Sequence, residues 1–147
     1  MGPVPPARSD ATIFVGVDIA GVDQVASRMS EQPGLAEQVF TERELGYAGG
    51  RGRHAEHLAA RFAAKEAVFK ALGGALPWRD VEVVNGASGR PRLRLHGAAL
   101  AAAERKGIRD MEISLSHTDG VAIAFVVLTT ASATARDAIE LVQEAAR

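Results

Sequence analysis

The stretch RFAAKEAVFKALG at residues 61–73 decides the fold of this chain. With the residues before it, this stretch predicts one long helix over residues 54–72, which Gly73 and Gly74 end. Alanines allow close packing of the helix against its neighbours, and larger apolar side chains recur at helical spacing. The apolar stripe comprises Leu58, Phe62, Phe69 and Leu72.

The charged residues of this helix indicate a binding or catalytic site. Glu66 and Lys70 stand one helical turn apart, as do Arg61 and Lys65 just before them, and Arg53 precedes the helix. A carboxylate among several cations fits a site that holds a metal ion and a polyphosphate together. Spacing alone leaves an alternative open, in which these residues form an ordinary solvated face with charge pairs.

Asp18 is the candidate second carboxylate. It follows TIFVGV at residues 12–17, a short apolar run that predicts a buried strand ending at Asp18. Magnesium prefers hard oxygen ligands, and it commonly uses one or two protein carboxylates with substrate phosphate and water. Asp18 and Glu66 are therefore the candidate metal ligands. An aspartate in this place is also common as a helix cap or turn residue, and that alternative stays open.

A second polar cluster lies at the end of a strand predicted over residues 111–116. Ser114 and Ser116 alternate onto one face, and His117 follows at the turn. Hydroxyl groups and a histidine suit a bound phosphate. A serine nucleophile with a histidine base is disfavoured, because adjacent residues in a strand point to opposite faces. A structural role for this histidine stays open.

Two weaker patterns have ordinary explanations. His54, Glu56 and His57 lack the HExxH spacing of a zinc site, and the chain has no cysteine to complete one. The basic segment RPRLR at residues 90–94 is either the solvated face of a hairpin or a strand edge that meets an acidic partner.

Composition excludes several classes of protein. The chain has 147 residues, 47% apolar and 24% charged, which is typical of a single soluble domain. A net charge of −1 argues against a nucleic-acid or anionic-membrane protein. The absence of cysteine excludes disulfides and thiolate chemistry. No apolar run reaches about 18 residues and no signal peptide is visible, so we expect a cytoplasmic protein.

The remaining elements predict an α+β domain, with a mainly antiparallel sheet packed against the long central helix. The further predicted strands span residues 81–84, 92–96, 111–116 and 121–128. The further predicted helices span residues 21–30, 35–40 and 98–106, and a capping box starts another at residues 41–44. The order β-α-α-α-β-β-α-β-β indicates mainly antiparallel pairing.

The sequence also predicts how the chain divides into three segments, and one loop within the central segment. We expect a flexible N-terminal segment at residues 1–11, one domain at residues 12–130 and a C-terminal helical extension at residues 131–147. Residues 46–52 (GYAGGRG) are rich in glycine and predict a mobile loop inside the domain.

Taken together, these motifs resemble the holo-acyl-carrier-protein synthase type of 4′-phosphopantetheinyl transferase. The resemblance covers about residues 14–128 in order and spacing, and the combination is far more specific than any one piece. The matching segments are GVDI at residues 16–19, FTEREL at 40–45, RFAAKEAVFKALG at 61–73, GRP at 89–91 and SLSH at 114–117.

The resemblance implies an enzyme with the 4′-phosphopantetheinyl transferase fold. It would transfer the phosphopantetheine arm of coenzyme A to a serine of an apo acyl carrier protein of fatty-acid or polyketide synthesis, releasing adenosine 3′,5′-bisphosphate. The resemblance also implies a homotrimer with active sites between subunits, in which Asp18 and His117 come from one chain and the helix of Glu66 from its neighbour, and Mg²⁺ held by Asp18 and Glu66. Lys70 would join these two in catalysis. The residues implied to bind the co-substrate are Arg53, Arg61, Lys65, Lys70, Gly73, Ser116 and His117.

The chain departs from the family pattern at two places. Gln24 stands where the family often carries an arginine that contacts the carrier, and Gly73-Gly74-Ala75 replaces the family's GTG. Two other functions remain open from the sequence. One is a non-catalytic module that binds coenzyme A or a carrier protein on the same fold, and the other is a Mg²⁺-dependent pyrophosphate hydrolase.

Overall fold

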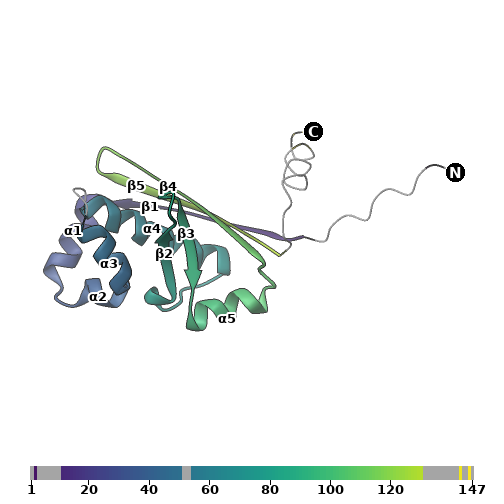
Figure 1. Ribbon diagram of the computed structural model, residues 1–147, viewed down its shortest axis with the longest axis horizontal. Coiled ribbons are helices and arrows are strands. Elements are labelled where there is room, and N and C mark those ends of the chain that lie inside the picture. Colours follow the sequence, from purple (N-terminus) through teal and green to yellow (C-terminus); the bar gives the residue numbers. More distant parts are fainter. Residues whose placement is uncertain (1, 3–10, 51–53, 131–142, 144–145, 147) are drawn as a thin grey trace.

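The computed structural model describes residues 2, 11–50, 54–130, 143 and 146. Within these residues the elements follow the order β1, α1–α4, a 3₁₀ turn, β2, β3, α5, β4 and β5 (Figure 1). The helices are α1 (Val22–Glu31), α2 (Leu35–Val39), α3 (Glu42–Gly49), α4 (His54–Leu72) and α5 (Gly97–Arg105), and the 3₁₀ turn is Trp78–Asp80. The strands are β1 (Ile13–Gly21), β2 (Val81–Asn85), β3 (Pro91–Leu95), β4 (Asp110–Thr118) and β5 (Val121–Thr129).

Three long strands form an antiparallel sheet in the order β1-β5-β4, and β2 and β3 form a separate hairpin. In Figure 1 the helices gather on one side of the three long strands. Burial alternates along β5, where every second residue from Ala122 to Leu128 is buried. The sheet therefore has an inner face that packs on the helices and an outer face that no described element covers.

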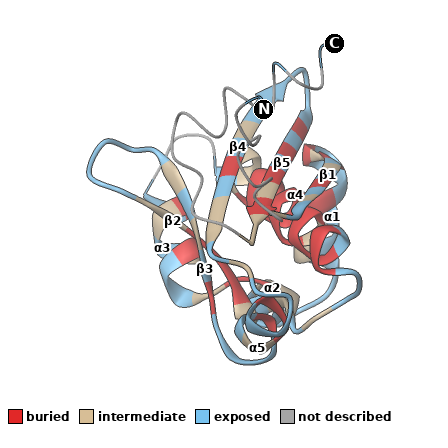
Figure 2. Ribbon diagram, turned by 90° about the vertical axis from the view of Figure 1, so that its right-hand side faces the viewer, coloured by how far each residue is buried: buried red, intermediate tan, exposed pale blue. Residues whose placement is uncertain are grey.

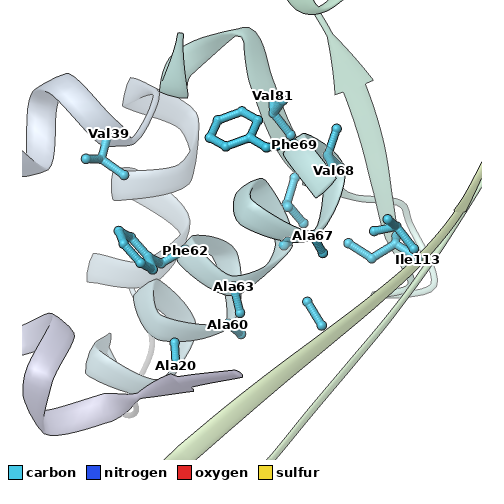
Figure 3. Packing of buried hydrophobic residues seen from close by; sticks show 14 of the residues in the cluster. Ala20, Val39, Ala60, Phe62, Ala63, Ala67, Val68, Phe69, Val81 and Ile113 are labelled. Carbon is cyan, nitrogen blue, oxygen red and sulfur yellow. The ribbon is translucent and has the colours of Figure 1, made fainter. Parts of the chain in front are cut away.

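Helix α4 is the centre of the domain. It packs on β1 and β5 on one side, and on α1, α3 and β2 on others. Figure 2 shows α4 in the colour of buried residues along most of its length, and Figure 3 shows its side chains inside the apolar cluster. The predicted apolar stripe is correct, but burial extends well beyond it. Even Arg61 and Lys65 of α4 are buried.

A glycine in β1 sets how closely the sheet approaches α4. A Cβ atom added at Gly16 would lie 1.8 Å from the carbonyl oxygen of Ala67, far inside any allowed contact. No other residue fits there without moving the strand or the helix. This close approach places the next inward residue of β1, Asp18, beside the following turns of α4.

The helix ends follow local chemistry. Thr41 and Glu44 form the predicted capping box at the start of α3. Gly73, at φ 92°, ends α4 in the left-handed region that glycine adopts without strain. The amides of Gly73 and Gly74 both bond the carbonyl oxygen of Phe69, at 3.0 and 2.9 Å.

Three local expectations are corrected. Strand β1 continues to Gly21, because its last residues pair with β5 down to Val121, so Asp18 lies within the strand and not at its end. Residues 46–49 belong to α3 and are not a loop, since the capping box starts a helix that runs through them. The segment from residue 21 to 72 holds the four helices that were predicted separately, so the element order given above, which counts three helices there, omits one. The expected terminal segments, 1–11 and 131–147, lie almost wholly outside the described residues.

The close approach at Gly16 predicts a large loss of stability in Gly16→Ala, by about 2–4 kcal/mol, because the methyl group overlaps a helix backbone that cannot give way. Urea unfolding measures it. Gly46→Ala is the matched control, since Gly46 lies in α3 with nothing within 4 Å of an added Cβ. The control should be unchanged or more stable by up to about 1 kcal/mol. Equal stability of both variants would contradict the proposed packing.

Candidate functional site

Asp18, Glu66 and Lys70 meet where the inner face of β1 touches α4. The ammonium group of Lys70 lies 2.9 Å from Asp18 Oδ1, and it also bonds the carbonyl oxygen of Val17 at 3.0 Å. Asp18 is mostly buried at 12% exposure, whereas Lys70 is 59% exposed. The structure therefore brings together residues that are 52 positions apart in the sequence.

Glu66 has an unusual acidity. Its pKa is raised from 4.5 to about 7, first because burial penalises the charged form, and then because of a hydrogen bond with Asp18 and the negative charge of Asp18. The positive charges of Lys70 and Arg28 act in the opposite direction. In the free protein, Glu66 therefore changes charge near neutral pH. A group of this kind can both bind a cation and exchange a proton.

The two carboxylates leave one buried oxygen without a donor. Asp18 Oδ2 has no hydrogen-bond partner, because Lys70 bonds the other oxygen. A hydrogen bond between Asp18 and Glu66 requires a proton on one of the two carboxyl groups, so it is lost when both are ionised. A divalent cation would satisfy both carboxylates in that ionised state. The donor set therefore fits Mg²⁺, which needs only one or two protein carboxylates when a phosphate supplies the other oxygens.

No group of three or more His, Asp or Glu side chains within residues 11–50 and 54–130 is arranged to hold a metal without help.

Two hollows meet at Glu66. One lies against α1 and is lined by Ile19, Ala20, Gly21, Asp23, Gln24, Val25, Ser27, Arg28, Phe62 and Glu66. The other lies at the end of α4 and is lined by Glu66, Phe69, Lys70, Gly73, Gly74, Ala75, Leu76 and Trp78. Aromatic rings line both hollows: Trp78 stacks on Phe62 at 4.9 Å between ring centroids and meets Phe69 edge to face at 5.1 Å. The carboxylate of Glu66 is thus open to two bound groups at once.

Lys65 does not join this cluster. It is fully buried on the opposite side of α4, where its ammonium lies 2.9 Å from Glu44 and 3.1 Å from the carbonyl oxygen of Trp78. It also donates to the carbonyl oxygen of Val81. These contacts use all three of its donors. Burial lowers the pKa of Lys65, and the charge of Glu44 opposes that effect.

Arg61 is likewise turned into the protein. It donates to the side chain of Asn85 at 2.6 Å, and its guanidinium lies 4.3 Å from the centre of the Tyr47 ring. The structure thus separates the cations of α4 into two kinds. Lys70 is exposed, whereas Arg61 and Lys65 are buried and connect the helix to α3 and to the β2–β3 hairpin. The sequence did not reveal this division, because helical spacing does not say which turns are covered by other elements.

Ser116 and His117 lie on opposite faces of β4. Ser116 pairs with Ile123 and belongs to the outer face, whereas His117 pairs with the buried Ala122 and belongs to the inner face. His117 Nδ1 lies 3.4 Å from a carboxylate oxygen of Glu56 at the start of α4. Neither residue lies in the two hollows around Glu66.

Of the remaining site residues predicted from the sequence, one lies at the site and one lies outside the described residues. Gly73 lines the hollow at the end of α4 beside Lys70. Arg53 lies outside the described residues. Arg28 was not singled out in the sequence, although its charge acts on Glu66 and it lines the hollow beside α1. Its place in the amphipathic first helix, ten residues after Asp18, was the only available signal.

The fold and the site suit a transferase that acts on a phosphate-linked cofactor. The profile of the 4′-phosphopantetheinyl transferase superfamily matches residues 14–128. The chain belongs to the 4′-phosphopantetheinyl transferase superfamily, so the resemblance read from the sequence and the predicted α+β fold class are both confirmed.

Named relatives agree with this assignment. A holo-[acyl-carrier-protein] synthase of Frankia casuarinae is 49% identical over 122 residues, which cover 82% of this chain and 99% of that protein. The synthase of Streptomyces avermitilis is 50% identical over 117 residues, covering 78% and 95%. Among solved structures, the Chronobacterium ammoniagenes ACPS-CoA complex has a TM-score of 0.69 at 34% identity, covering 80% of this chain and 96% of that one.

The two lysines of α4 should respond differently to substitution. Lys65→Met leaves Glu44 charged and buried without its cation, which should lower the free energy of unfolding by about 3–5 kcal/mol. Lys70→Met removes an exposed group and should change stability by less than about 1 kcal/mol. Chemical unfolding of both variants measures this difference. A stable Lys65→Met variant would refute the structural role assigned to Lys65.

Proposed function

We propose that this chain is a phosphopantetheinyl transferase that moves the 4′-phosphopantetheine arm of coenzyme A to a serine of an apo acyl carrier protein. Its family and its holo-[acyl-carrier-protein] synthase relatives support this reaction. The observation that carries the proposal in this structure is the position of Asp18, Glu66 and Lys70 at the junction of two hollows. A transfer between two substrates requires a place where both substrates reach the same reactive side chains.

Asp18 and Glu66 are proposed to hold Mg²⁺, because Asp18 Oδ2 lacks a donor and Glu66 lies beside it. When bound, the ion would withdraw negative charge from the pyrophosphate of coenzyme A. Lys70 adds a fixed positive charge next to the same oxygens. It is exposed and is held in place by Val17 and Asp18.

The proposed chemistry requires no nucleophile from this chain. The carrier serine oxygen forms a bond to the phosphorus that bears the pantetheine arm. The bond from that phosphorus to the bridging oxygen breaks, and its electron pair leaves with adenosine 3′,5′-bisphosphate. Glu66 accepts the serine proton. Phosphoryl transfer depends mainly on positioning and charge neutralisation, and Lys70 supplies positive charge here.

The outer face of the sheet supports assembly into a homotrimer. It exposes a contiguous set of apolar side chains, including Val15 at 57%, Ile19 at 65% and Phe125 at 45%. An apolar face of this kind on a soluble protein favours contact with another chain. Ser116 lies on the same face, so in the assembly it would lie between subunits. With His117 and Arg53, it is proposed to contact the nucleotide of coenzyme A across that interface.

The proposed place of action is the cytoplasm, where the substrates of such an enzyme occur. Among the helices that the structure describes, none is both long and apolar enough to cross a membrane. The proposed catalytic domain spans residues 12–130. A non-catalytic module that only binds coenzyme A or a carrier is disfavoured, because it has no need for paired carboxylates beside a lysine.

Intact mass spectrometry of an apo acyl carrier protein tests the function. Incubation with the chain, coenzyme A and Mg²⁺ should add one phosphopantetheine arm, and EDTA should abolish the gain. Glu66→Gln should lower the rate by about 10²-fold or more, because it removes a metal ligand and the proton acceptor. Full Mg²⁺-dependent activity in Glu66→Gln would overturn the site. Breakdown of coenzyme A without a carrier would indicate a hydrolase instead.

Analytical ultracentrifugation tests the assembly. The chain should sediment as a trimer, and Phe125→Asp should produce monomers without transferase activity, because a charge cannot be buried in an apolar interface without a partner. Leu100→Asp is the matched control, since Leu100 is 43% exposed but lies in α5, away from this face. A native monomer with full activity would exclude the interfacial site.

A further inference from the structure

We propose that the C-terminal segment, residues 131–147, binds as an amphipathic helix in a groove of the same chain, between β3, α5 and the start of β4. This inference goes beyond the transfer reaction and does not depend on it. Three observations support it: the apolar lining of the groove, the point at which the chain leaves β5, and the charges of the groove and of the segment.

The groove lies where β3 runs beside β4, the edge strand of the three-stranded sheet (Figure 2). It holds about 330 Å³, which is at the lower end of the roughly 300–1,000 Å³ of small-molecule sites. Leu100 of α5 lines it and is 43% exposed. A groove of this kind suits a few apolar side chains from one face of a helix. The apolar residues that line it are Pro91, Leu93, Leu95, Leu100, Ala103, Ile108, Met111 and Ile113.

The chain leaves the sheet at one end of this groove. Thr129, the last residue of β5, pairs with Asp110, and its carbonyl oxygen accepts a hydrogen bond from the amide of Arg109 at 2.7 Å. Arg109 and Asp110 both line the groove. Residues 131–136 span up to about 20 Å when extended, which exceeds the roughly 17 Å length of a strand such as β3. The residues after them therefore reach the whole groove without leaving their own chain.

The C-terminal segment has an apolar stripe that fits this groove. Ala138, Ile139, Leu141, Val142 and Ala145 recur at helical spacing. A helix of this length is marginal in water unless its apolar face packs on another element. The match to the family profile ends at residue 128, so the segment is an addition to the common domain. Because the outer face of the sheet is proposed for assembly, the groove is the apolar surface left beside the point of exit.

The groove also offers positive charge. Of its acidic residues, Glu112 already pairs with Arg90 at 3.0 Å, and Asp110 accepts a hydrogen bond from the amide of Met111 at 2.9 Å. Within residues 11–50 and 54–130, no side chain pairs with Arg92 or Arg109. These two arginines exceed the one remaining acid. The charged residues that line the groove are Arg90, Arg92, Glu104, Arg109, Asp110 and Glu112.

The segment brings carboxylates to those arginines. Asp137, Glu140 and Glu144 follow one another at three- and four-residue spacing, so in a helix they form a line along one edge of the apolar stripe, next to Leu141. Its two arginines, at positions 136 and 147, fall on the side opposite the stripe. Asp137 is the first carboxylate after the exit and therefore meets Arg109. Glu140, almost one turn further along, then meets Arg92.

Disulfide trapping in the full chain tests the docking, and it is specific because the sequence has no cysteine. Leu100→Cys with Leu141→Cys should form a disulfide within one chain under mild oxidation, seen by intact mass and non-reducing electrophoresis. Leu100→Cys with Gln143→Cys is the matched control, since Gln143 is exposed and lies off the stripe. The first pair should react at least about tenfold faster, because docking holds its thiols at disulfide distance.

Two results would overturn the proposal. Equal rates for the two cysteine pairs would show that the segment is tethered near the groove without binding in it. A disulfide between two chains would place the segment on a neighbouring subunit.

Charge reversal tests the pairing of Arg92 with Glu140. Adding Arg92→Glu to the Leu100→Cys, Leu141→Cys chain should slow disulfide formation about fivefold, and adding Glu140→Arg as well should restore the rate. Arg94→Glu is the control, since Arg94 is exposed on the same strand but does not line the groove. An unchanged rate in Arg92→Glu, or an equal loss in Arg94→Glu, would refute the assigned charge pair.

Discussion

The contact between the backbone of Gly16 and the carbonyl oxygen of Ala67 determines the position of the site. Strand β1 lies so close to α4 there that no side chain fits between them. Two residues further along, the inward position of β1 is Asp18, and the neighbouring residue of the helix is Glu66. The two carboxylates are therefore brought together by packing of the backbone. Burial, a hydrogen bond with Asp18 and the negative charge of Asp18 raise the pKa of Glu66, and the positive charges of Lys70 and Arg28 oppose this in part.

That packing requires α4 to stay fixed on its other side, and a buried polar network serves this purpose. Glu44 accepts hydrogen bonds from the amides of Thr41 and Val83, both at 2.9 Å, and pairs with Lys65 at 2.9 Å. Thr41 in turn donates to Glu82 at 2.6 Å. The capping box of α3 is thus joined to α4 and to β2. Each buried charge is fully bonded, which is the condition under which such a network specifies one arrangement of its elements.

The sequence predicted much of this fold because its elements follow simple periodicities. The limits 54–72 of α4 and the two hairpins agree with the structure to within a few residues. The length of β1 was underestimated, because the charged Asp18 interrupts the apolar run, although residues 18–21 continue to pair with β5. The motif and its resemblance predicted that Asp18, Glu66 and Lys70 share a site, but the expectation that Asp18 and Glu66 come from different subunits was wrong, since they meet within one chain. The burial of Arg61 and Lys65 was not predictable from spacing, since it depends on β2 and α3 covering that side of the helix.

Lys65 and Lys70 show why a short motif can carry both stability and function. They lie five positions apart on one helix and therefore project on widely different sides of it. One side is covered by the protein, so its lysine is held by Glu44 and two carbonyl oxygens. The other side borders the two hollows, so its lysine remains exposed beside Asp18. Glu66 lies between them in sequence and lines both hollows. The different roles of the two lysines thus follow from helix geometry and from which elements cover each turn, and the fully buried Ala63, Ala64 and Ala67 let those elements pack closely on the helix.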